Sequence, residues 1–202
     1  MGSAPTGSQP VTPSPQTKPD PPTAPANRGA IPVGDSKQQL QSGIVEYNNG
    51  NYNAAFSIFN DLAQKGNPEA EYYVSILFSK GLGTAPDNDK ANFWLKKSAD
   101  HRYVEAQFAY AMTLLSNRSG TDPLSKEGMR YLAKAADQDY QPALKQYVDI
   151  VLRGYHELPA IRSAIKYSSR LQALLSDQYE IDAYKKKEEQ LKNLLTEGKR
   201  HD

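Results

Sequence analysis

The stretch PEAEYYVSILFSKGLGTAPDNDKANFWLKKSAD, residues 68–100, decides the fold of this chain. Its first part carries an apolar stripe at helical spacing, made of Ala70, Val74, Leu77 and Phe78. Gly81, Gly83 and Pro86 then interrupt the helix, because glycine tolerates positive φ and proline cannot continue the hydrogen-bond ladder. A second stripe follows, made of Ala91, Trp94, Leu95 and Ala99 and preceded by the candidate caps Asp87, Asn88 and Asp89. The pattern predicts a helical hairpin, which needs neighbours to bury both of its faces.

Small residues recur at a spacing that supplies those neighbours. Alanines separated by 36 and 37 residues stand at 63, 99 and 136, and further alanines follow seven residues later at 70, 106 and 143. A small residue also precedes each copy, at Ala55, Ala91 and Gly128, with an aromatic residue close behind it, at Phe56, Phe93 or Trp94, and Tyr131. Small residues at one register let helices approach closely, and the aromatic rings fill the space between hairpins. The periodicity therefore predicts a repeat array.

The unit resembles a Sel1-like repeat, a relative of the tetratricopeptide repeat. The resemblance rests on Ala70-Glu71, Phe78, Gly81-Leu82-Gly83, Asp89-Lys90-Ala91, Trp94-Leu95 and Ser98-Ala99. It covers residues 37–175, although the copy from Ala106 has SNRSGTDPLSKEG in place of the glycine turn. The resemblance implies an all-α, right-handed α-solenoid of about four hairpins. Such arrays serve many partners, so the resemblance specifies fold more closely than function.

Other segments flank the predicted array. Residues 1–36 hold nine of the fourteen prolines, and we expect them to form a disordered, proline-rich tether. Met1-Gly2-Ser3 resembles an expression remnant, so we expect the natural N-terminus to differ, with a lipid anchor as one alternative. Within the array, Asn51 is the expected cap of the helix that follows it. Residues 176–202 predict an amphipathic helix that caps the array, with dimerisation or partner binding as the alternative.

Composition argues against several classes of function. The formal charge is +1, from 24 basic and 23 acidic side chains, so no footprint for nucleic acid is present. The chain has no cysteine and no run of apolar residues long enough for a transmembrane helix. His101, His156 and His201 are far apart, and no phosphate-binding loop or catalytic motif occurs. We therefore expect no enzyme activity, cofactor or metal site.

Asn117-Arg118-Ser119 matches a glycosylation acceptor, a tripeptide that is common by chance.

The family register suggests a groove lined by the first helix of each hairpin. Its expected partner-binding residues are Ile44, Tyr47, Tyr72, Ile76, Phe108, Met112, Leu115, Lys145 and Asp149. The first three units offer apolar and aromatic side chains and the fourth offers charges, which suits a peptide or amphipathic helix. The alternative at each position is that the side chain belongs to the core.

The expected function is that of a protein-binding scaffold or adaptor. The resemblance and the proline-rich arm suggest a bacterial envelope protein on the periplasmic side, with an outer-membrane lipoprotein as one form. It would help to assemble a secretion, pilus, motor or polysaccharide-export machine. One alternative is a module that binds peptidoglycan or exopolysaccharide, with Tyr72, Tyr73 and Phe108 as candidate contacts. A further alternative is a secreted effector that binds host proteins.

Overall fold

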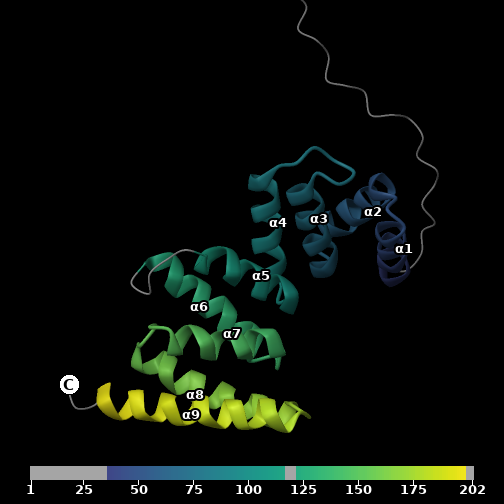
Figure 1. Cartoon of the computed structure of the whole chain (residues 1–202). Helices are drawn as coiled ribbons and strands as arrows, with labels where there is room; N and C mark the ends of the chain where they lie inside the picture. Colours follow the sequence, from purple (N-terminus) through teal and green to yellow (C-terminus); the bar gives the residue numbers. More distant parts are fainter. Residues whose placement is uncertain (1–35, 117–121, 199–202) are drawn as a thin grey trace, which may run out of the picture. The chain divides into compact units, whose positions relative to one another are not determined.

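The computed structural model describes residues 36–116 and 122–198, which form nine α-helices and no strand (Figure 1). The helices are α1 (Ser36–Asn48), α2 (Tyr52–Gln64), α3 (Pro68–Lys80), α4 (Asn88–Asp100), α5 (Val104–Leu115), α6 (Pro123–Ala136), α7 (Gln141–Leu152), α8 (Leu158–Leu174) and α9 (Gln178–Gly198). Each helix packs against the next one along the chain, and α9 also contacts α7. Four successive hairpins and a last helix result. The prediction of an all-α solenoid is confirmed.

Side-chain caps begin the central helices. The Asn67 side chain accepts a hydrogen bond of 2.9 Å from the backbone N–H of Ala70, and Pro68 occupies the first turn of α3. Asp87 caps α4 in the same way, through the N–H of Lys90 at 2.9 Å. Asn51 stands at the N-cap position of α2, as expected, but without the side-chain cap bond. Its side-chain amide donates to Glu46 at the end of α1, at 2.8 Å, and makes no cap bond to α2.

The repeated small residues lie where helices meet. The alanines at 55, 63, 70, 91, 99, 106, 136 and 143 are all buried. Gly128 of α6 has the same role, because a Cβ there would lie 2.7 Å from Leu115 of α5. The regular spacing seen in the sequence is therefore the spacing of close contacts between helices.

The core consists of two buried clusters along the array. One joins α1 to the first part of α4 and includes Phe59, Leu62 and Leu77. The other runs from the end of α4 to α9. Helix α9 contributes Tyr184 and Leu191 to this second cluster, so its apolar stripe covers α8.

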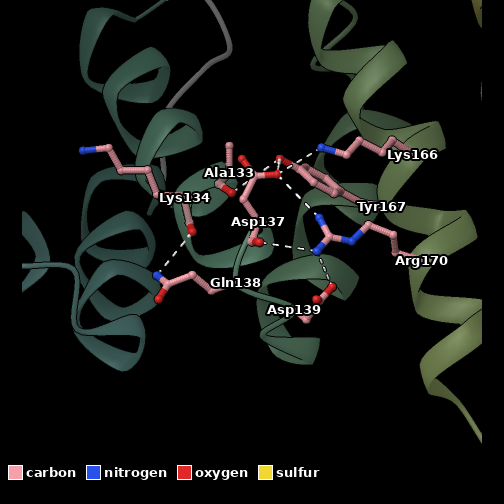
Figure 2. A network of polar contacts seen from close by, with 8 residues as sticks. All are labelled: Ala133, Lys134, Asp137, Gln138, Asp139, Lys166, Tyr167 and Arg170. Carbon is pink, nitrogen blue, oxygen red and sulfur yellow. Dashed lines mark hydrogen bonds and ion pairs between the residues drawn. The ribbon is translucent and has the colours of Figure 1, made fainter.

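A polar network ties the end of α6 to α8 (Figure 2). The Asp137 carboxylate accepts a hydrogen bond of 3.2 Å from the Tyr167 hydroxyl and pairs with Lys166, also at 3.2 Å. Arg170 binds the same carboxylate and that of Asp139. The Tyr131 hydroxyl donates to Asp100 in the preceding repeat, so the tyrosine–aspartate contact recurs between successive second helices. These contacts fix the stacking of neighbouring hairpins.

Three expectations fall outside the described residues: the proline-rich tether except for Ser36, which begins α1, the Met1-Gly2-Ser3 start and the Asn117-Arg118-Ser119 tripeptide. Among the helices of the described part, none combines the length and apolar character that a membrane crossing requires.

Candidate functional site

Tyrosine side chains form a continuous strip along α1, α3 and the start of α5. We call Tyr47, Tyr73, Tyr72 and Tyr103 the tyrosine strip. Successive ring centroids along it lie 5.4, 6.2 and 5.4 Å apart. Tyr73 also stacks on the buried ring of Phe59, at 4.5 Å, which anchors the strip to the core. All four tyrosines are half-buried, so each presents part of its ring to solvent.

A second aromatic pair continues the strip toward α7. Phe108 of α5 meets Tyr140 edge to face at 5.6 Å. Tyr103 and Tyr140 occupy equivalent places, because each is the residue that immediately precedes a first helix, α5 or α7. Phe108 and Tyr140 pack against the same core cluster as Tyr72 and Tyr103. We call the tyrosine strip and the Phe108–Tyr140 pair together the aromatic surface.

Two carboxylates share a helix face with these rings, because Glu69 stands three residues before Tyr72 and Glu105 three residues before Phe108. Glu69 and Glu105 stand in the first turns of α3 and α5, at matching positions one repeat apart. Oxygen Oε2 of Glu105 is buried and has no hydrogen-bond partner among the described residues. Neither carboxylate forms an ion pair with a basic side chain of the described residues.

Burial and neighbouring carboxylates raise the pKa values of several groups around these rings. Burial raises the pKa of Glu69, and the neighbouring charge of Glu105 raises it further. Burial, followed by the charges of the two glutamates, raises the pKa of Tyr103 well above its usual value. The pKa of Tyr140 is raised by burial and then by Glu105. Such shifts indicate a surface where negative charge accumulates without a compensating cation.

The nine predicted partner-binding residues fall into different environments. Ile44 and Tyr47 pack against the first core cluster, and Tyr72 and Phe108 pack against the second while contacting other rings. Ile76 and Met112 are half-buried. Leu115 lies against Gly128, between the two helices of its own hairpin. The aromatic members therefore come together, and Leu115 does not join them.

The two charged candidates are engaged by the chain itself. Lys145 Nζ lies 2.7 Å from Glu180 Oε1, and Lys187 Nζ lies 2.8 Å from Asp149 Oδ1. Glu180 and Lys187 both belong to α9. The last helix thus takes the charged positions that we had expected a partner to contact.

Glu69, Glu105, Tyr103 and Tyr140 did not figure among the residues predicted from sequence. Their signal was nevertheless present, since the glutamates are 36 residues apart and the two tyrosines 37 residues apart. These are the spacings of the repeat. A search for glutamates and tyrosines that recur at the spacing of the alanines would have indicated the site.

A separate, open hollow lies near the ends of α4 and α6. It is lined by Asp100, Arg102, Gln107, Lys134, Asp137 and Gln138. Several of these groups already bind one another or their neighbours, as Gln138 does with Gln107 at 2.8 Å. Among the residues described, no group of three histidine, cysteine, aspartate or glutamate side chains is arranged to hold a metal ion.

Comparison with known proteins agrees with this fold. Residues 68–103 and 104–140 each match the model of the Sel1 repeat. Two Sel1 repeats are thus found at residues 68–140, and they confirm the resemblance over this central part of residues 37–175. Proteins with such repeats act in general as scaffolds for protein–protein interaction and are generally not catalytic. A search of curated proteins found no match.

Two crystal structures share the fold. A protective antigen of uropathogenic Escherichia coli strains, displaying an SLR fold, aligns with a TM-score of 0.58 at 21% identity, over 69% of this chain and 30% of that one. A Sel1 repeat protein from Oxalobacter formigenes aligns with a TM-score of 0.52 at 23% identity, over 70% of this chain and 63% of that one. The alignments thus span less than two thirds of either relative.

Proposed function

We propose that this chain is a non-catalytic adaptor that binds a segment of another protein along the tyrosine strip and the adjoining Phe108–Tyr140 pair. The observation that carries the proposal is the series of half-buried, contacting rings along α1, α3 and α5, with the Phe108–Tyr140 pair following at α5 and α7. Aromatic rings supply a large contact area at low conformational cost, and they are enriched at protein interfaces. Because the strip is anchored on the core through Phe59, its geometry exists before a partner arrives.

The partner we propose is a peptide or an amphipathic helix. The strip follows first helices that repeat along the array, so its contacts also repeat, as the side chains on one face of an extended or helical segment do. The proposed setting is a bacterial envelope assembly, with the chain on the periplasmic side. The proline-rich N-terminal composition supports that setting, since such a segment serves as a tether.

Affinity capture from envelope extract tests the adaptor function. The bait is the full chain, compared with a Tyr72→Ala/Phe108→Ala variant. The control is Phe93→Ala, because Phe93 is the most exposed phenylalanine, at 62%, and lies on the second helix α4 away from the strip. Circular dichroism establishes that each variant is folded.

We expect one protein to be retained by the wild type and by Phe93→Ala, and lost by the double variant. Equal retention by the double variant would contradict the strip as the binding surface. If the wild type retains no protein but co-sediments with peptidoglycan, the glycan-binding alternative is supported and the adaptor function is wrong.

A further inference from the structure

Glu69 and Glu105 have no basic partner among the described residues, whereas the buried Glu71 nearby has two. Glu71, two residues after Glu69, is fully buried and faces Lys97 Nζ at 3.1 Å and His101 Nδ1 at 2.8 Å. Glu105, one repeat after Glu69, forms no such ion pair among the described residues, and its buried Oε2 has no hydrogen-bond partner there. An unpaired, partly buried carboxylate costs free energy, so its presence calls for a reason outside the fold.

Helix dipoles do not supply that reason by themselves. Glu69 and Glu105 are first-turn residues, where a negative charge is favourable. A carboxylate that served only the helix would point both oxygens to water or to backbone N–H groups. Oε2 of Glu105 does neither. Burial, followed by neighbouring carboxylate and tyrosine groups, raises the pKa values of Glu69 and Tyr103, and no lysine or arginine contributes to either shift.

The aromatic rings near these carboxylates can also attract a cation. Tyr72 and Tyr103 contact each other at 5.4 Å, and Tyr140, at the start of α7, contacts Phe108 of α5 at 5.6 Å. The faces of aromatic rings attract an ammonium or guanidinium group, and the attraction grows as the site loses water. Rings and carboxylates together offer a cation both an apolar wall for its aliphatic stem and charge-assisted hydrogen bonds for its head.

We propose that Glu69 and Glu105, set among Tyr72, Tyr103 and Tyr140, bind a lysine or arginine side chain of the partner segment. This inference rests on the proposed adaptor function and defines the chemistry of its partner, a basic rather than an acidic or purely apolar segment. The side chain enters between the starts of α3 and α5, and the adjacent tyrosine strip contacts the apolar residues that follow it.

Selection from a random peptide library tests this preference before the natural partner is identified. Phage that display dodecapeptides are panned against the full wild-type chain and counter-selected against Glu69→Gln/Glu105→Gln. The matched control is Glu189→Gln/Glu197→Gln, which removes the same charge from exposed positions of α9. Selected peptides are then synthesised, with each lysine also in its acetylated form, and their affinities are measured by fluorescence anisotropy.

We expect the selected peptides to share a lysine or arginine at a fixed position. Their affinity should fall at least about tenfold on the glutamine variant or on acetylation of that lysine, since a charge-assisted contact contributes more than the roughly 1.4 kcal/mol of a tenfold change. The α9 control should bind like the wild type. The glutamine variant should melt close to the temperature of the wild type, because relief of the partly buried, unpaired charge offsets the lost interaction with the helix dipoles.

Different results would overturn the cation site and the adaptor function. Peptides that lose binding to Tyr72→Ala/Phe108→Ala but carry no shared basic residue would overturn the cation site and leave the adaptor function standing. The same holds for peptides that bind the glutamine variant as well as the wild type. If no selected peptide depends on Tyr72 and Phe108, both proposals are wrong.

Discussion

Replacement of Gly83 by alanine tests how closely the turn between α3 and α4 approaches α2. Gly83 has a φ of +69°, and a Cβ there would lie 2.2 Å from the carbonyl oxygen of Tyr52 and 2.8 Å from the backbone nitrogen of Asn53. Backbone atoms cannot move aside as the end of a side chain can. The residue therefore faces both an unfavourable backbone conformation and a steric conflict with the start of α2.

Gly50 provides the matched control, since its φ is +79° and an added Cβ would meet nothing within 4 Å. The left-handed conformation costs a non-glycine residue about 1–2 kcal/mol, which both variants incur. Overpacking adds about 1–3 kcal/mol at position 83 only. We therefore expect Gly50→Ala to lower the free energy of unfolding by about 1–2 kcal/mol and Gly83→Ala to lower it by about 2–5 kcal/mol.

Urea denaturation followed by circular dichroism measures both values under one set of conditions. A separate transition of the N-terminal hairpins in Gly83→Ala would agree with the account, because each repeat contacts only its neighbours. Equal destabilisation by the two alanines would refute the close approach of the turn to α2.

Three further predictions concern the buried polar groups. Glu71→Ala should lower the free energy of unfolding by about 1–3 kcal/mol, because two basic side chains lose their buried partner; a change within about 0.3 kcal/mol would contradict this. Tyr167→Phe removes the hydroxyl bound to Asp137 and should cost about 1 kcal/mol in the same urea assay, whereas an unchanged midpoint would argue against the network of Figure 2. Burial raises the pKa of Tyr147 from 10.0 to about 12, so the folded state keeps a proton that the unfolded chain releases over this range. Stability should therefore fall as pH rises through it, less steeply in Tyr147→Phe; identical slopes would contradict the shift.

The sequence predicted the hairpins because local signals and repeat spacing agreed. The alanine register at 63, 99 and 136 marked the contacts between helices, and Pro68 and Gly81 marked the ends of α3. Asn51 occupies the predicted N-cap position, but its side chain does not cap α2, for a local reason. An asparagine side chain can cap a following helix or donate to a nearby carboxylate, and the proximity of Glu46 decided the outcome.

The candidate site was harder to predict, because a half-buried residue on a first helix can face either the core or solvent. Leu115 and Phe108 have the same apolar character, yet the first packs inside its hairpin and the second joins the aromatic surface. The surroundings of Lys145 and Asp149 could not be predicted, because both side chains pair with residues of α9 that are more than thirty positions away along the chain. Helical periodicity carries no information on such distant contacts. The path of α9 over α7 becomes visible only in three dimensions.

Site-specific photo-crosslinking tests most directly the claim that the first helices carry the binding surface. A benzophenone amino acid is placed at Met112, a half-buried position on α5 near the aromatic surface, or at the exposed Phe93 on α4. The account predicts one crosslinked protein from envelope extract for position 112, abolished by Tyr72→Ala, and none for position 93. A product at position 93 alone, or one at position 112 that persists in Tyr72→Ala, would contradict it.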